Sequence, residues 1–339
     1  MRQRLRAGVD HFIHAEDMSD QQIAELLVQA GVDIAIDLKG LTQDGRPGIF
    51  QHRPAPIIVN YLGYPGTMGA ACYDYIIGDP VVTPMEHAEF YSEKIVQLPH
   101  SYQVNDRQRA IAAHTPSRQQ HGLPDEGFVF ACFNNNYKIT PEVFDVWMRL
   151  LAKVDGSVLW LLADNHDAVA NLRREALARG IESSRLVFAA RAPLPEHLAR
   201  HRLADLFLDT LPCNAHTTAS DALWAGVPLL TCLGNAFQGR VAASLLRALS
   251  LDELVTTHLD DYEATAIDLA RSPERLAALR DRLATQRQTS SLFDGKRFAR
   301  NLESALITMA DRHYAGLPPV AFDVQDADTA NPGGVVATS

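Results

Sequence analysis

The sequence predicts an α/β protein built from two Rossmann-like lobes, and three observations lead to this fold class. Short apolar runs alternate with helical patterns along most of the chain, an order that favours parallel sheets with right-handed crossovers. The run GFVFACF at 127–133 is apolar throughout, which is typical of a strand covered on both faces. With 339 residues, the chain is too long for one ordinary domain and suits two.

The first lobe is predicted to span residues 1–106. Its first helix begins after Ser19, which forms a capping box with Gln22, and it ends at Gly31 after an amphipathic stripe. Short apolar or alternating runs predict four strands, at 33–38, 57–62, 73–77 and 94–98. The polar stretch 107–124 has no strong periodic pattern and is predicted to link this lobe to the second.

The second lobe is predicted over 125–290 as a series of strand–helix units. Thr140 and Pro141 mark one helix start, because threonine is a common N-cap and proline suits the first helical position. The predicted elements are 127–133, 140–154, 157–163, 167–180, 185–189, 196–203, 204–209, 218–225, 228–233, 239–249, 259–272 and 273–286.

The chain is predicted to end in a helix and a tail. A helical pattern at 294–313 defines a closing segment, 291–316, whose helix we expect to pack back on the first lobe. The tail 317–339 is rich in Pro, Gly, Asp and Ala, and this composition predicts disorder.

Composition excludes several classes of partner. The net charge of −10 argues against nucleic acid and against an anionic membrane surface. The chain has no apolar run long enough for a membrane helix and no signal-peptide pattern near Met1, so we expect a cytoplasmic protein.

No metal site is expected. The cysteines, Cys72, Cys132, Cys213 and Cys232, are scattered without zinc spacing. The segment 164–167 (DNHD) is interpreted as a polar turn rather than as a metal-binding acidic motif.

The most informative segment is 213–221 (CNAHTTASD), which follows an apolar run at 203–208. Thr218 is predicted to cap a helix, with Asp221 as the acid of a capping box. His216 and Thr217 would then lie at a helix N-terminus at the carboxyl end of a strand, where backbone amides and the helix dipole favour an anion. Asp221, one turn into the helix, could accept hydrogen bonds from a sugar diol. A capped helix without any ligand fits the same residues.

Lys138 occupies a similar position in another strand–helix unit. It follows the strand at 127–133 and precedes the helix start at Thr140 by two residues. Ligands of open α/β sheets bind outside the carboxyl ends of the strands, and a lysine there offers a mobile charge for a phosphate. A solvated loop lysine is the alternative interpretation.

Several segments together carry a family resemblance. They are 53–69 (RPAPIIVNYLGYPGTMG), 133–144 (FNNNYKITPEVF), 157–163 (SVLWLLA) and 201–231 (HRLADLFLDTLPCNAHTTASDALWAGVPLLT). In this order they resemble the catalytic region of protein O-linked N-acetylglucosamine transferases, glycosyltransferase family forty-one, and the bacterial members in particular. The resemblance covers most of the chain and implies the two-lobe GT-B architecture.

The resemblance also implies roles for particular residues. Lys138 would be the catalytic residue that stabilises the UDP leaving group. The diphosphate and ribose would be bound by Asn135, where many relatives have glutamine, and by His216, Thr217, Thr218 and Asp221. The uracil would be read by Ala192, His197 and Arg200. Leu194 departs from the lysine that some relatives have near the ribose. The sugar and acceptor would be contacted by Leu62, Gly63, Tyr64, Pro65 and Cys213.

The implied function is an inverting, metal-independent transfer of N-acetylglucosamine from UDP-N-acetylglucosamine to Ser or Thr hydroxyls of proteins. The expected partners are the UDP-sugar and a protein or peptide acceptor, with no cofactor beyond the donor. Family members begin the first lobe with a segment carrying Asp-Phe and paired histidines, and this chain starts downstream of it. The first lobe is therefore expected to be incomplete. The alternatives are a non-catalytic UDP-sugar-binding remnant or scaffold and, less favoured by the motif order, a UDP-sugar epimerase or hydrolase.

Overall fold

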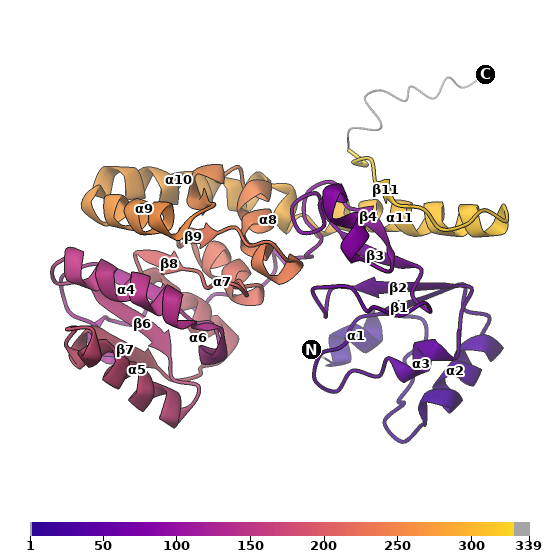
Figure 1. Ribbon diagram of the computed structural model, residues 1–339, viewed down its shortest axis with the longest axis horizontal. Helices are drawn as coiled ribbons and strands as arrows, with labels where there is room; N and C mark the ends of the chain where they lie inside the picture. The colour runs from indigo at the N-terminus through magenta and orange to yellow at the C-terminus, as the bar shows by residue number, and fades with distance from the viewer. Residues whose placement is uncertain (1, 329–339) are drawn as a thin grey trace. The chain divides into compact units, whose positions relative to one another are not determined.

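The computed structural model describes residues 2–328, which form two compact α/β units (Figure 1). Among the described residues, the first unit comprises 2–77, 86–96 and 304–322, and the second comprises 78–85, 97–303 and 323–328. Each unit contains its own sheet, of five and six strands respectively. The predicted fold class, two α/β lobes with separate sheets, is confirmed.

The first unit is built on the sheet β1-β2-β3-β4-β11. Its strands are β1 (Ile34–Asp37), β2 (Ile57–Tyr61), β3 (Tyr75–Gly78), β4 (Lys94–Gln97) and β11 (Phe322–Asp323). β1 pairs with β2, and β2 with β3, in parallel. The four strands predicted in this part of the chain are present, with ends displaced by one or two residues.

Helices α1 (Arg2–Ala7), α2 (Asp20–Gln29) and α3 (Gly48–Gln51) and the 3-10 helix η1 (Met85–Phe90) complete this part of the chain. The predicted capping box of α2 is confirmed: the Ser19 amide donates to Gln22 Oε1 (2.8 Å), and the Gln22 amide donates to Ser19 Oγ (3.2 Å). Phe50 of α3 joins Ile58 and Tyr73 in the core below the sheet. Neither α1 nor α3 was predicted, because each is too short to show a helical period.

The second unit is built on a six-stranded sheet of order β10-β9-β8-β5-β6-β7, whose ladders are all parallel. Its strands are β5 (Val129–Cys132), β6 (Val158–Leu162), β7 (Leu186–Ala189), β8 (Leu206–Leu208), β9 (Leu229–Cys232) and β10 (Val255–Thr256). Every residue of β5, β8 and β9 is buried, as expected of central strands covered on both faces.

The α-helices of this part are α4 (Pro141–Lys153), α5 (His166–Ala178), α6 (Leu194–Arg200), α7 (Thr217–Ala225), α8 (Val241–Ala248), α9 (Leu259–Arg271), α10 (Pro273–Thr289) and α11 (Gly295–Tyr314). Short 3-10 helices lie between them: η2 (Gln119–His121), η3 (Asn136–Lys138), η4 (Ser183–Arg185), η5 (His201–Leu203), η6 (Phe237–Gly239), η7 (Asp252–Leu254) and η8 (Ser291–Phe293). The predicted start of α4 is confirmed, since Thr140 is its N-cap and Pro141 its first residue.

The compact units are divided differently from the predicted lobes. The chain passes into the second unit after Ile77 and again after Val96, and residues 107–124 belong to that unit. The closing helix α11 begins in the second unit, and its later part, from Ser304, belongs to the first. Among residues 2–328, no helix is both long and apolar enough to cross a membrane.

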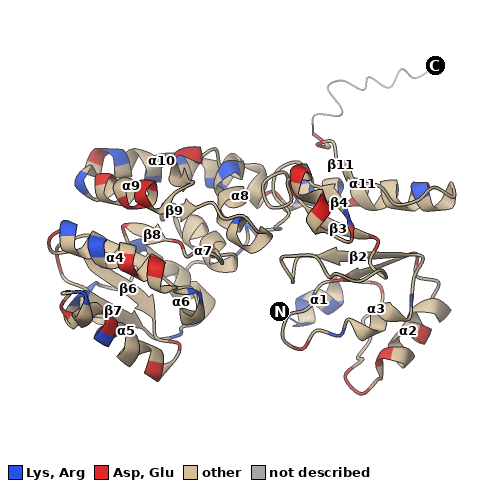
Figure 2. Ribbon diagram, viewed as in Figure 1, with Lys and Arg blue, Asp and Glu red and all other residues tan. Residues whose placement is uncertain are grey.

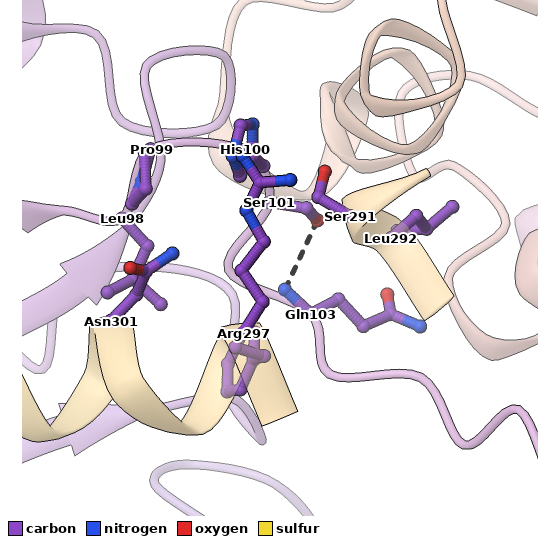
Figure 3. A pocket seen from close by; sticks show the side chains of 10 residues that line it. Leu98, Pro99, His100, Ser101, Gln103, Ser291, Leu292, Arg297 and Asn301 are labelled. Atoms are coloured by element: carbon purple, nitrogen blue, oxygen red, sulfur yellow. Dashed lines mark hydrogen bonds between the residues drawn. The ribbon is translucent and has the colours of Figure 1, made fainter. Parts of the chain in front are cut away.

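The prediction of a disordered tail is wrong for residues 317–328. β11 lies beside β4 in the first sheet, and the Val324 amide donates to the Gln97 carbonyl (2.9 Å). Asp326 is then buried, where it accepts hydrogen bonds from Arg297 of α11 and lies 3.0 Å from His100 Nε2. Figure 3 shows His100 and Arg297 converging at this place.

Composition suggested disorder because it does not reveal the ion pairs that anchor the segment to α11, Arg297–Asp326 and Arg300–Asp328. The rest of the predicted tail, 329–339, lies outside the described residues.

Candidate functional site

The loop 209–216 connects β8 to α7 and is held by a buried carboxylate. Asp209, 2% exposed, follows β8 directly. Its Oδ1 accepts hydrogen bonds from the amides of Thr210 (2.7 Å) and Ala215 (2.5 Å). Its Oδ2 accepts from the Thr231 hydroxyl (2.6 Å). Both ends of the loop are therefore tied to one side chain. Burial raises the pKa of Asp209 to about 6.

Helix α7 begins one residue earlier than predicted. His216 is its N-cap and makes no side-chain capping bond, and Thr217 is exposed in the first turn. The Thr218 hydroxyl donates instead to Asn134 Oδ1, at the end of β5. The prediction that Thr218 caps the helix, with Asp221 as the capping acid, is therefore wrong. The first amides of α7 still lack intrahelical acceptors, which keeps the helix N-terminus suited to an anion.

Lys138 and His216 lie close to each other at the carboxyl ends of β5 and β8. Lys138 Nζ donates to the Asn214 carbonyl (2.6 Å), two residues before His216. Burial and the Lys138 charge lower the pKa of His216 to about 4, so its ring is neutral at pH 7. His216 Nε2 lies 3.1 Å from the Gln238 carbonyl, and because a carbonyl only accepts, this nitrogen carries the proton. The strand-end positions predicted for both residues are confirmed.

Polar atoms beside Lys138 are incompletely satisfied. Asn136 Nδ2 and Asn214 Oδ1 are buried without a hydrogen-bond partner among the described residues. Asn135 Nδ2 makes only a long hydrogen bond, to the Tyr137 hydroxyl (3.5 Å). Buried polar atoms usually have partners, so the two unpartnered amides indicate a place where a ligand or water supplies them.

Asp221 has a partner that was not predicted. Arg109 Nη1 lies 2.5 Å from Asp221 Oδ1, and the two side chains are only 14% and 8% exposed. The Arg109 guanidinium also lies 5.8 Å from the centre of the Trp224 ring. Burial raises the pKa of Asp221, and the charge of Arg109 opposes that rise. Arg109 lies in the segment interpreted as a linker, which carried no signal of this role.

The three residues expected to read uracil lie in α6 and in the loop before it. Ala192 is exposed in the loop after β7. The His197 ring packs against Phe133, with the ring centres 5.3 Å apart, and the Arg200 guanidinium lies 5.0 Å from the centre of the same ring. Arg200 also donates to the Ala190 carbonyl (2.6 Å). Burial lowers the pKa of His197 to about 4, so it is neutral at pH 7. Phe133 connects this group to Asn134, the partner of Thr218.

The residues predicted for the sugar and acceptor are divided between the units. Leu62, Gly63, Tyr64 and Pro65 follow β2 in the first unit, whereas Cys213 is in the loop 209–216 of the second.

The loop after β2 is tightly constrained. Leu62 has a φ of +70°, which is uncommon outside glycine and recurs at functional sites. A Cβ on Gly63 would lie 2.1 Å from the Leu38 carbonyl oxygen, so only glycine fits there.

A pocket of about 560 Å³ opens beside Pro212 and Gln238, at the carboxyl ends of β9 and β10. Gln238 links it to the site, because its carbonyl is the partner of the His216 ring. The segment 164–167, interpreted as a polar turn, forms the start of α5 instead: Asn165 is its N-cap, His166 and Asp167 are its first residues, and Asp164 pairs with Arg191. Within residues 2–328, no group of three or more His, Cys, Asp or Glu side chains is arranged to hold a metal ion.

Sequence reasoning missed Asn134, Asp209 and Gln238 in addition to Arg109. Asp209 directly follows β8, and Asn134 lies two residues after the end of β5; these positions after buried strands were the available signal for both. Gln238 contributes only a backbone carbonyl, which no side-chain pattern reveals.

Two α/β units, the second with a lysine near the N-terminus of a helix that follows a parallel strand, have the architecture of two-lobe glycosyltransferases. The model of glycosyl transferase family 41 matches residues 1–117 and 112–302. The chain therefore belongs to glycosyltransferase family 41.

Named relatives agree with this assignment. The chain is 40% identical over 337 residues to a probable UDP-N-acetylglucosamine–peptide N-acetylglucosaminyltransferase, SEC, of Arabidopsis thaliana, covering 98% of this chain and 34% of that protein. It is 28% identical to the corresponding transferase of Caenorhabditis elegans, covering 94% and 37%. A solved mutant of the Thermobaculum terrenum O-GlcNAc transferase superposes with a TM-score of 0.84 at 32% identity, covering 93% and 60%. The chain thus spans about a third of the length of these curated relatives.

Proposed function

We propose that this chain forms the catalytic region of an enzyme that transfers N-acetylglucosamine from UDP-N-acetylglucosamine to Ser or Thr hydroxyls of proteins. The observation that carries the proposal is the convergence of Lys138, His216 and the N-terminus of α7 in the second unit. The names of the relatives supply the donor and the acceptor class, since they are peptide N-acetylglucosaminyltransferases.

The chemistry follows from charge that develops on the leaving group. When the glycosidic bond to UDP breaks, negative charge builds up on the β-phosphate. The Lys138 ammonium and the amides and dipole of α7 are preorganised to stabilise that charge. Direct attack by the acceptor hydroxyl on the face opposite UDP forms the new glycosidic bond as the bond to UDP breaks, inverts the anomeric carbon and releases the hydroxyl proton to solvent. In this mechanism the protein's own groups stabilise the leaving group, with neither a metal ion nor a cofactor.

The remaining site residues fit the parts of the donor. Asp221 is proposed to bind the ribose hydroxyls, and Thr217, Thr218 and Asn135 the diphosphate. The group around Phe133 is proposed to bind uracil: Ala192, His197 and Arg200. The loop 62–65 and Cys213 are proposed to contact the sugar and the acceptor. The proposed partners are a UDP-sugar and a protein or peptide in the cytoplasm, and not nucleic acid or a membrane.

Removal of Lys138 tests the proposal. In Lys138→Ala we expect transfer of radiolabelled N-acetylglucosamine to an acceptor peptide to slow by about 100-fold or more, as on loss of a preorganised charge partner. UDP affinity, measured by calorimetry, should fall much less, because leaving-group charge is largest in the transition state. EDTA should not change the rate.

Lys296→Ala is the matched control, since Lys296 is an exposed lysine on α11. Wild-type chain that does not bind UDP, or Lys138→Ala with the wild-type rate, contradicts the proposal. The non-catalytic alternative is supported if the chain transfers no sugar but binds UDP, and if substitutions of the proposed site residues weaken that binding.

A further inference from the structure

Asp209 is a buried charge that the proposed transfer reaction does not use directly. It is 2% exposed at the end of β8, beneath the loop 209–216. The ionisable groups that face it come from four elements: Cys132 of β5, Lys138 of η3, Cys232 of β9 and Tyr262 of α9. Burial raises the pKa of both thiols and of the phenol, so these three groups are neutral at pH 7. Lys138 is therefore the cation among them.

The hydrogen bonds of Asp209 suit the ionised carboxylate. Its oxygens receive three donors, the amides of Thr210 and Ala215 and the hydroxyl of Thr231, at 2.5 to 2.7 Å. An ionised carboxylate only accepts, whereas a protonated one must direct its own O–H at a neighbour and loses acceptor capacity. The bonds to Thr210 and Ala215 close the loop that carries Asn214, whose carbonyl receives the Lys138 ammonium.

The ionised carboxylate also has an energetic cost. Because the pKa of Asp209 is raised, to about 6, the folded chain binds this proton more readily than the unfolded chain does. The stability that the fold gains from this tighter proton binding is therefore fully present below the unfolded pKa of Asp209, near 4. It is lost as the pH rises through 6. At neutral pH the carboxylate destabilises the fold relative to a neutral group of the same shape. A carboxylate that lowers the stability of the fold at neutral pH is expected to have a role in the site.

We propose that ionised Asp209 is a positioning residue of the donor site: it closes the loop 209–216 and thereby holds Lys138 and the N-terminus of α7 in their binding arrangement. The inference rests on the proposed function, because the donor whose binding it supports is a UDP-sugar. A competing effect would weaken donor binding, since a carboxylate near the diphosphate repels it. If repulsion dominated, removing the charge would strengthen binding.

Asp209→Asn separates these effects. The amide keeps the shape, but its bonds with the Thr210 and Ala215 amides and with Thr231 Oγ1 join neutral groups and are about half as strong as those of the ionised carboxylate. The probe is UDP-N-acetylglucosamine, because UDP itself has a terminal phosphate that titrates near pH 6.

For the wild type we expect calorimetric affinity to fall about tenfold between pH 7.5 and 5, the scale of one hydrogen bond to a charged group. For Asp209→Asn we expect affinity about tenfold weaker than wild type at pH 7.5 and nearly constant down to pH 5.

Two other ionisable groups in the site, His216 and Asp221, would change the pH dependence of the donor affinity in ways that differ from the effect of Asp209. His216 has a pKa of about 4 in the free site, and any protonation induced by bound diphosphate would strengthen binding as the pH falls. Burial also raises the pKa of Asp221. If protonation of Asp221 caused the loss of binding at low pH, that loss would persist in Asp209→Asn and overturn the inference.

Thr231→Val provides a second variant that keeps the charge. It removes one donor that lowers the pKa of Asp209, so the acidic loss of affinity should move up by about one pH unit.

Thermal unfolding gives an independent measurement. The melting midpoint of Asp209→Asn should equal or exceed that of the wild type at pH 7.5, and the difference should vanish by pH 5, where wild-type Asp209 is mostly protonated. An Asp209→Asn protein that binds as tightly as the wild type, or more tightly, or keeps the same acidic loss, overturns the inference and leaves the proposed function intact. Wild-type chain that does not bind UDP-N-acetylglucosamine overturns both.

Discussion

Arg109 and Asp221 form a buried ion pair in which each charge depends on the other. Burial shifts both groups toward their neutral forms, raising the pKa of Asp221 and lowering that of Arg109. Their attraction opposes both shifts. Arg109 therefore favours the ionised form of the carboxylate proposed to bind ribose, and it need not touch the nucleotide to do so.

Arg109→Met tests this dependence. Without the guanidinium the pKa of Asp221 rises further, and we expect UDP affinity at pH 7 to fall about tenfold, as on loss of a charged hydrogen-bond acceptor. Because a rise in pH favours the ionised form of Asp221, calorimetry should show a smaller loss of affinity as the pH is raised. Arg107→Met is the control, since Arg107 is exposed in the same segment and donates only to the Gln288 carbonyl (3.1 Å). Equal losses in both variants would contradict a specific role for Arg109.

At the scale of elements, the C-terminal segment shows how side chains beyond a short strand, Asp326 and Asp328, can anchor it to a helix. β11 has only two residues, Phe322 and Asp323, too few to be stable by itself. The segment is held beyond the strand by Asp326, which pairs with Arg297 of α11. The Arg297 charge and hydrogen bonds hold the pKa of Asp326 well below its usual range.

Asp326→Asn should therefore lower the melting midpoint at pH 7, with a loss of about 2 kcal/mol in the free energy of unfolding, as for a hydrogen bond between charged groups. Because the pKa of Asp326 is lower in the folded chain than in the unfolded chain, its ionised carboxylate stabilises the fold at pH values above the unfolded pKa. This stabilisation is lost as the pH falls through the folded pKa. The difference between variant and wild type should accordingly shrink from about pH 4 downwards. Asp311→Asn, an exposed acid on α11, is the control. Unchanged melting in Asp326→Asn would show that β11 is held by other contacts.

At the scale of the whole molecule, a protein of net charge −10 is proposed to bind a diphosphate. Acidic and basic residues occur together along single elements, for example on α10 (Figure 2). The proposed site therefore depends on local groups, Lys138 and a helix N-terminus, rather than on an overall positive field.

The residues proposed for UDP all belong to the second unit, between Asn135 and Asp221. UDP at 100 times its dissociation constant should stabilise the structure that binds it by about 2.7 kcal/mol. We expect hydrogen exchange to slow in α7 and the loop 209–216 and to remain unchanged in β1 and β2. Slower exchange in β1 and β2 alone would place the nucleotide in the first unit.

Local patterns were sufficient for much of the fold. The apolar runs located the predicted strands, because a strand covered on both faces must be apolar over consecutive positions. The helix starts at Ser19 and Thr140 were predicted correctly, since a cap is formed by residues within one turn. The same local reasoning placed Lys138 and His216 at strand ends, where parallel topology brings them to one edge of the sheet.

The sequence by itself thus determined where the buried strands lie, how two helices begin, and which positive and hydroxyl groups stand at the strand ends. The tertiary structure alone decided which partners those groups have. Arg109 and Asp221 are 112 positions apart, and Thr218 and Asn134 are 84 apart. Such pairs form only when the folded chain brings distant segments together, and burial then makes their charges and hydrogen bonds strong enough to override local preferences such as the capping of α7 by Thr218.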